Sequence, residues 1–274
     1  MAENETDTYA LGRSAAETRR LILQHRIYGP ITRRFFEAAG IGAGMTVLDI
    51  GSGAGDVAFL LADLVGPRGR VVGVDMNGAI LETARARAAS AGYANVTFLA
   101  GAAEAVAGDA RFDAVAGRHV LMYVAEPAAL LRGLAGLLRP GGIVAFQETD
   151  VNNPPATFPT TEIGAILQKV MVPPPGLPGP DVRIGMKLYR LFEEAGLPRP
   201  ELRMEAPLGG GPDWPGYDYL VETLRSLAPM MRRFGFDPDT LGLDTLASRL
   251  RDEVVAVGGV QMLSPVIGAS ARKA

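Results

Sequence analysis

The glycine-rich stretch over residues 47–56 is the part of the sequence best suited to hold a ligand. An apolar run over residues 46–50 leads into the glycines Gly51, Gly53 and Gly55, and a helical pattern follows directly. Glycines let the backbone come close to a ligand and adopt conformations that other residues avoid. The start of a helix also offers backbone N–H groups that have no partner within the helix. This strand, turn and helix order predicts a ligand-binding loop.

Two acidic residues decide which ligand the loop favours. Dinucleotide-binding enzymes place a third glycine where this sequence has Asp56, and they bind a pyrophosphate at the start of the helix. A carboxylate at that place would repel a pyrophosphate, and Asp49 adds a second acid at the end of the strand. The pattern favours an amino-acid nucleoside that carries an ammonium and a sulfonium. A nicotinamide oxidoreductase and a glycine turn without a ligand are the alternatives.

Asp75 is the second candidate ligand residue. It ends the apolar strand expected over residues 70–74 and lies about 20 residues beyond the glycine loop, where a carboxylate can accept both hydroxyls of a ribose. Asp is also a common turn residue, so Asp75 alone would be weak evidence. Together with the glycine loop it indicates a nucleoside site.

Four stretches in this order resemble the class I S-adenosylmethionine-dependent methyltransferases, in particular the small-molecule branch that acts on natural products or quinones. They are VLDIGSGAGD, VVGVDMN, FDAVAGRHVLMYV and LLRPGGIVAF, within residues 9–150. The resemblance implies S-adenosylmethionine as cofactor. It also implies an α/β fold, a doubly wound and mostly parallel seven-stranded sheet with a helical lid.

The resemblance also implies which residues contact the cofactor. Gly51, Ser52 and Gly53 would line its methionine part, and Asp75 would hold its ribose. Many members of the family carry Asp directly after the glycine of the third strand, where this chain has Ala102. The adenine would lie against Met76, Gly101 and Ala102. Arg118 would lie near the methionine end, and Tyr9 of the N-terminal segment would also contact the cofactor.

The chemistry of methyl transfer depends mostly on alignment of the acceptor with the sulfonium methyl. A base is needed only if the acceptor must lose a proton. His119 is the candidate base because it follows the fourth strand, and a structural histidine at a strand end is the alternative. Glu148 and Asp150 leave the fifth strand at the same edge, where open sheets bind ligands, so Glu148 is the second catalytic candidate and either acid could orient the acceptor. Both could equally be solvated loop carboxylates.

The flanking segments are expected to form a lid. A capping box predicts a helix from Ser14 to about Tyr28, broken by Gly29 and Pro30. We expect a tail and lid helix over residues 1–30, the cofactor-binding core over 31–150, and lid insertions with the last helix and strands of the core over 151–274. The remaining expectations for single elements are a helix from Pro127 that includes Leu137 and Leu138, a fifth strand over residues 143–147 after a turn at 140–142, a helix over 182–195, and a last strand over 261–269 at an edge or bulge because of Pro265.

A late group of aromatic and methionine side chains suggests the kind of acceptor. These side chains could line an apolar pocket for an aromatic or lipophilic molecule, or form the small core of the lid itself. They are Trp214, Tyr217, Tyr219, Met230, Met231, Phe234 and Phe236. We favour oxygen as the acceptor atom, then carbon, then nitrogen. A cofactor-retaining enzyme that does not methylate, such as a cyclase, is the alternative function.

Composition narrows the function classes. The 274 residues carry a formal charge of −3, which disfavours a nucleic-acid substrate and hence an RNA methyltransferase. There is no cysteine and there are two histidines, which excludes thiolate and multi-histidine metal sites. The start is acidic and polar, and no apolar run reaches the roughly 20 residues of a membrane span. We therefore expect a cytoplasmic monomer or homodimer with a small-molecule acceptor and no metal.

Overall fold

A computed structural model describes the chain except residues 1–14, 103–105, 107–111, 175–178 and 234. The chain divides into two compact units, each made of segments that are distant in sequence. The larger unit comprises residues 29–150, 179–205 and 266–274, and the smaller one comprises residues 1–28, 151–178 and 206–265. Within the described residues, no helix is both long and apolar enough to cross a membrane.

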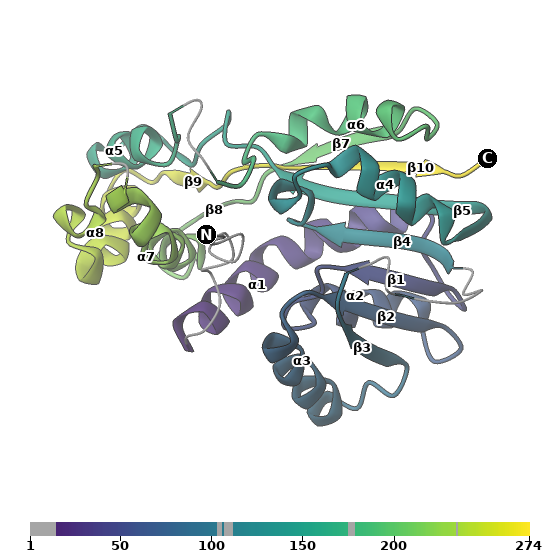
Figure 1. The fold of residues 1–274 in the computed structure, drawn as a ribbon. Helices are drawn as coiled ribbons and strands as arrows, with labels where there is room; N and C mark the ends of the chain where they lie inside the picture. Colours follow the sequence, from purple (N-terminus) through teal and green to yellow (C-terminus); the bar gives the residue numbers. More distant parts are fainter. Residues whose placement is uncertain (1–14, 103–105, 107–111, 175–178, 234) are drawn as a thin grey trace, which may run out of the picture. The chain divides into compact units, whose positions relative to one another are not determined.

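The larger unit is built on a seven-stranded sheet with the order β3-β2-β1-β4-β5-β10-β7 (Figure 1). The first five strands in this order pair in parallel with one another, while β10 pairs antiparallel with both β5 and β7. The predicted doubly wound, mostly parallel sheet of seven strands is confirmed. The strands are β1 Thr46–Ile50, β2 Arg70–Asp75, β3 Val96–Ala100, β4 Phe112–Arg118, β5 Leu138–Thr149, β7 Glu201–Glu205 and β10 Val266–Arg272.

Helices cover both faces of this sheet and bury one apolar cluster on each. One cluster joins the sheet to α4 and α6, through side chains such as Leu131 and Phe192. The other joins it to α1, α2 and α3, through Phe36, Leu61 and Leu81. Burial on both faces explains why the parallel strands read as continuous apolar runs. The helices of this group are α1 Ala15–Ala38, α2 Asp56–Val65, α3 Gly78–Ala91, α4 Pro127–Gly136 and α6 Leu188–Glu194, with the short 3-10 turns η3 Leu121–Tyr123 and η4 Ile184–Lys187.

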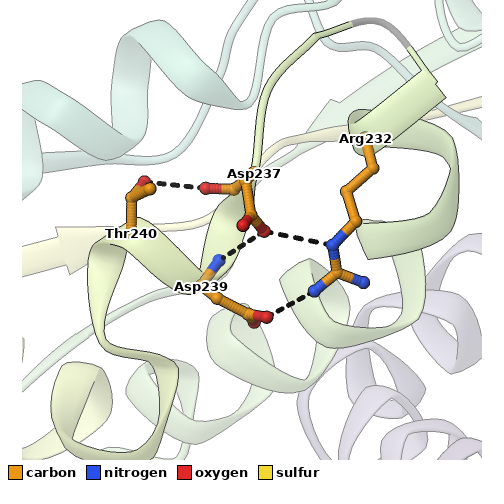
Figure 2. Close-up of polar contacts among 4 residues, drawn as sticks. All are labelled: Arg232, Asp237, Asp239 and Thr240. Atoms are coloured by element: carbon orange, nitrogen blue, oxygen red, sulfur yellow. Dashed lines mark hydrogen bonds and ion pairs between the residues drawn. The ribbon is translucent and has the colours of Figure 1, made fainter.

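The smaller unit has its own antiparallel sheet, with the order β6-β9-β8. Its last helices are connected by a polar cluster on the surface (Figure 2). Arg232, at the end of α7, donates hydrogen bonds to Asp237 at 3.1 Å and to Asp239 at 2.5 Å. Asp237 also accepts from the Asp239 backbone and caps the next turn. The elements are β6 Ala156–Phe158, α5 Glu162–Val170, β8 Leu208–Gly210, α7 Gly216–Arg233, η5 Pro238–Leu241, α8 Leu243–Ala256 and β9 Val260–Met262.

Three predictions near prolines were wrong. The helix expected to end before Gly29 continues through Pro30 to Ala38, because proline removes only one hydrogen bond and Ile31 and Phe35 beyond it are buried. The expected last strand is two strands in two different sheets, and Pro265 lies between them. The second of these, β10, is not an edge strand, since it has a neighbour on each side.

Two further boundaries differ from expectation at glycine and proline positions. Strand β5 begins at Leu138 and so includes the turn expected over residues 140–142, with an irregular register to β4. Leu137 and Leu138 therefore lie outside α4. The helix expected over residues 182–195 is the 3-10 turn η4 followed by α6. Asn77 caps the start of α3 and Gly92 its end.

Candidate functional site

The glycine loop between β1 and α2 has a backbone that requires glycine. Gly51, Gly53 and Gly55 have φ angles of 65°, 50° and 92°, all in the left-handed region. The backbone N–H of Ser52 donates to the carbonyl of Val74 at 3.0 Å, which ties the loop to the end of β2. The turn predicted from sequence is therefore formed, and it lies at the carboxyl ends of adjacent parallel strands.

Asp75 is joined directly to this loop. Its side chain is buried, and its Oδ2 accepts the backbone N–H of Gly53 at 2.9 Å while Oδ1 accepts that of Asn77 at 2.8 Å. A backbone hydrogen bond from Gly101 to the Asp75 carbonyl, 3.0 Å long, brings the end of β3 to the same place. The structure thus brings together three of the predicted contact positions at one edge of the sheet.

Other predicted contact residues surround this edge with different exposure. Met76 follows Asp75 and is 74% exposed, which leaves its side chain available to a flat ligand. Ala102 is also exposed and offers a methyl group at the place where many family members have a carboxylate. Tyr9 and Phe234 lie outside the described residues.

Asp56 is paired with a positive charge, so its carboxylate does not act as the free negative charge that the sequence predicted. Its carboxylate forms an ion pair with Arg87 of α3, with 2.6 Å between Nη2 and Oδ1, and Arg87 also donates to the carbonyl of Ala54 at 2.6 Å. The same guanidinium lies over the ring of Phe59. Asp56 was predicted to repel a pyrophosphate, but its charge is compensated within the protein. Any preference of the site for a cation therefore depends on other acids.

Asp49 is such an acid. It is fully buried at the carboxyl-terminal half of β1, and within the described part of the chain neither carboxylate oxygen has a hydrogen-bond partner. Burial raises its pKa well above the ordinary value; the positive charge of Arg118 opposes this, and the nearby Asp75 and Asp56 add to it. An unpartnered buried carboxylate is costly, and a bound cation would compensate for that cost.

Arg118 is held by two residues that the sequence analysis missed. It is buried at the end of β4, and its Nη1 donates to the hydroxyl of Thr32 at 3.1 Å. That hydroxyl donates in turn to Oε1 of Gln147 on β5 at 2.7 Å. The burial of Thr32 could have been expected, since Ile31, Phe35 and Phe36 lie on the same face of the helix, but its pairing with Arg118 could not. Arg118 and Asp49 place opposite charges at this edge of the sheet.

Glu148 is fully buried at the end of β5, so it is not a solvated loop carboxylate. Its Oε1 accepts the backbone N–H groups of Val120 and Leu121, each at 2.9 Å, while Oε2 has no partner among the described residues. Burial raises the pKa of this carboxyl from 4.5 to about 7, against the opposing effect of the backbone N–H groups. Asp150 is also fully buried.

His119 lies directly after β4, at the same edge. It is half-buried, and its backbone has a φ of 57°. Its N–H donates to the carbonyl of Gln147 at 2.9 Å. Of the two predicted catalytic residues, His119 thus has a partly accessible side chain, while Glu148 has one oxygen committed to the backbone.

A family profile described as "Methyltransferase domain" matches residues 41–196, which contain the glycine loop and most of the large sheet. Among curated proteins, a ubiquinone/menaquinone biosynthesis C-methyltransferase of Hahella chejuensis is 35% identical over 133 residues, covering 47% of this chain and 52% of that protein. An arsenite methyltransferase of Aquipseudomonas alcaligenes is 38% identical over 113 residues, covering 38% of this chain and 33% of that protein. The chain spans about half or less of the length of these relatives.

Solved structures share the fold at low identity. A SAM-dependent methyltransferase from Aquifex aeolicus superposes with a TM-score of 0.50 at 20% identity, covering 68% of this chain and 90% of that one. The [4+2]-cyclase SpnF superposes with a TM-score of 0.53 at 19% identity, covering 89% of this chain and 80% of that one. These likenesses concern the fold alone.

Proposed function

Because the chain belongs to the methyltransferase domain family, we propose that it transfers the methyl group of S-adenosylmethionine to a small molecule. The observation that carries the proposal is a buried carboxyl group and a buried guanidinium at the sheet edge that holds the glycine loop. Asp49 is buried without a hydrogen-bond partner in the described chain, and the buried Arg118 is close enough to affect its pKa. An amino acid with an ammonium and a carboxylate would satisfy both groups.

The residues present fit this cofactor. Asp49 would hold the ammonium of its methionine part and Arg118 the carboxylate, while Asp75 would accept the ribose hydroxyls. The glycines of the loop let the backbone approach the ligand, since no side chain extends from them. When bound, the cofactor supplies an electrophilic methyl group on a sulfonium. The protein contributes alignment and electrostatics.

His119 is the proposed base for acceptors that must lose a proton. It is half-buried at the end of β4, and unperturbed imidazoles titrate near neutral pH. Deprotonation of a phenol or quinol makes its oxygen, and the ring carbons ortho to that oxygen, nucleophilic. We propose oxygen as the first acceptor atom; carbon is the alternative, and the name of the Hahella chejuensis relative favours it.

The acceptor is proposed to be an organic and mostly apolar molecule. Arsenite, which one relative's name gives as its substrate, binds most strongly to soft thiolates, and this chain has no cysteine. Trp214, Tyr217 and Tyr219 belong to the smaller unit. Tyr217 and Tyr219 are buried within that unit, so they contribute to its core, as the alternative interpretation of the aromatic group predicted. Trp214 is half-buried, and its Nε1 donates to Oε1 of Gln261 at 3.0 Å.

Calorimetry tests the proposal most directly. We expect S-adenosylmethionine and S-adenosylhomocysteine to bind in the micromolar range, and NAD not to bind. Asp75→Ala should weaken binding by about 1.5 to 3 kcal/mol, the range for a lost hydrogen bond to a charged group. Heat with NAD and none with the methyl donor would overturn the proposal. Mass analysis of products formed from phenols and quinols then distinguishes a methyltransferase from a cofactor-retaining cyclase.

A further inference from the structure

The turn after β4 is the most unusual backbone near the site. His119 is the single non-glycine residue of the described chain with a positive φ, at 57°. This conformation is uncommon for residues with a side chain and persists where the surroundings hold it in place. The contacts that hold His119 are therefore part of how the site is built.

Those contacts come from consecutive residues of β5. The N–H of His119 donates to the carbonyl of Gln147 at 2.9 Å, and the next two N–H groups, of Val120 and Leu121, both donate to Oε1 of Glu148 at 2.9 Å. Three successive backbone donors are thus fixed, and the last of them is the first residue of η3. A neutral hydrophobic side chain at position 148 would leave two of them without a partner.

The same turn packs closely against the glycine loop. A Cβ placed on Gly51 would lie 2.6 Å from Cγ2 of Val120, so the valine side chain fills the space that the missing side chain leaves. Gly51 itself has a φ of 65°. A shift of the backbone at Val120 would therefore change the support beneath the cofactor loop.

We propose that Glu148 is a positioning residue, which sets the backbone of residues 119–121 and thereby orients His119 and seats Val120 against Gly51. In this role Glu148 does not exchange a proton with the acceptor. An amide oxygen can accept the same two N–H groups, so glutamine should replace glutamate here. This inference rests on the proposed function only in assuming that the glycine loop binds the cofactor.

The experiment compares Glu148→Gln with Glu148→Leu, using S-adenosylhomocysteine as the probe. Hydrogen exchange measures protection of the Val120 and Leu121 amides, and calorimetry measures the dissociation constant. We expect Glu148→Leu to speed exchange at both amides and to weaken binding by about tenfold, as for a lost hydrogen bond to a charged group. Glu148→Gln should restore both properties. Val65→Ala, at the end of α2, is the control that lowers stability, since Val65 is buried in the apolar cluster that contains no residue of the turn.

Two outcomes would overturn the inference. If Glu148→Gln exposes the amides and weakens binding as much as leucine does, the ionised carboxylate itself is required. If Glu148→Leu changes neither amide exchange nor binding, the turn does not depend on this side chain. Should the leucine variant not fold, Val120→Ala tests the contact with Gly51, and unchanged binding there overturns that part. If the wild type does not bind the probe, the proposed function fails, and amide exchange still decides the role of Glu148.

Discussion

Asp75 and Glu148 are both buried carboxylates at the carboxyl ends of strands in one sheet, but the backbone satisfies them differently. Each oxygen of Asp75 accepts one N–H, from Gly53 and from Asn77. Glu148 receives two N–H groups on a single oxygen, and its other oxygen has no partner within the described residues. Both carboxylate oxygens of Asp75 thus accept hydrogen bonds from the backbone, whereas only one oxygen of Glu148 does so among the described residues.

This difference shows how one fold separates two tasks. At Asp75 one hydrogen bond comes from Gly53 of the glycine loop and the other from Asn77, two residues further along the chain, so the acid and the loop form one local unit. At Glu148 they come from the turn after β4, and burial raises the pKa of the carboxyl to about 7. The edge near β1 and β2 is therefore built to hold a charge, while the edge near β4 and β5 is built to hold a backbone shape. Substitutions can test this contrast.

The largest effect is expected where the two edges meet, at Gly51. Gly51→Ala would place a Cβ 2.6 Å from Val120 at a φ of 65°, so both overlap and backbone strain oppose it. We expect the free energy of unfolding to fall by about 3 kcal/mol and cofactor binding to be lost. Gly53→Ala is the matched control, since its φ is 50° but nothing lies within 4 Å, and it should cost only about 1 kcal/mol. Urea unfolding of both variants checks the difference; equal losses would show that Val120 does not press on the loop.

The second prediction concerns pH. The folded pKa of Glu148 is about 7, whereas an unfolded glutamate titrates near ~4.3. Between these values the native state holds a proton that the unfolded state has released, so the free energy of unfolding falls as pH rises through this window. The total is about 3 to 4 kcal/mol. Glu148→Gln cannot ionise, so its stability relative to wild type should grow by that amount from pH 4 to pH 8.

Urea unfolding at both pH values measures this difference. The raised pKa of Asp49 acts in the same direction, but Asp49 is present in both proteins and its effect cancels. A stability difference that does not change with pH would mean that Glu148 is not a buried group of raised pKa, and the contrast with Asp75 would be lost.

The third prediction concerns Thr32, whose hydroxyl connects Arg118 to Gln147. Thr32→Val keeps the shape and removes these hydrogen bonds, so stability should fall by about 1 to 3 kcal/mol. Because Arg118 loses an orienting contact, binding of S-adenosylhomocysteine should also weaken several-fold. Thr157→Val removes a buried hydroxyl in the smaller unit, where it accepts the N–H of Thr161. This control should lose stability and keep its affinity for S-adenosylhomocysteine. If calorimetry found the same affinity for Thr32→Val as for the wild type, Arg118 would not belong to the site.

How much of the site could be predicted follows from how local its contacts are. The loop and Asp75 were predictable, because glycine spacing and a strand-end acid specify a local conformation. The partners of Asp56 and Arg118 were not, since Arg87 and Thr32 come from helices that pack against the sheet only after folding. Sequence periodicity predicts that a helix has a buried face, but it does not predict which strand end that face meets.

Boundaries around prolines failed for a related reason. Pro30 removes one hydrogen bond from α1, a local cost that the buried side chains on both sides outweigh. At Pro265 the chain passes from the three-stranded sheet to the seven-stranded sheet, and local preference contains no information about that change. The inner parallel strands β1, β2 and β4 were predictable in type because their apolar runs are buried on both faces.

The smallest effect is expected at Asp237, which is exposed and has a lowered pKa, whereas Glu148 is buried and has a raised one. The N–H of Asp239 and the guanidinium of Arg232 lower the pKa of Asp237 on the surface of the smaller unit (Figure 2). A lowered pKa adds stability above the unfolded value and loses it as pH falls through the folded one. Arg232→Ala should therefore raise the pKa of Asp237 toward its ordinary range and shift Tm at pH 7 by about 2 °C at most, less in high salt. NMR titration of Asp237 and thermal unfolding at two salt concentrations check this. A large, salt-independent drop in Tm would mean that the exposed cluster behaves like the buried acids, and burial would no longer explain the contrast.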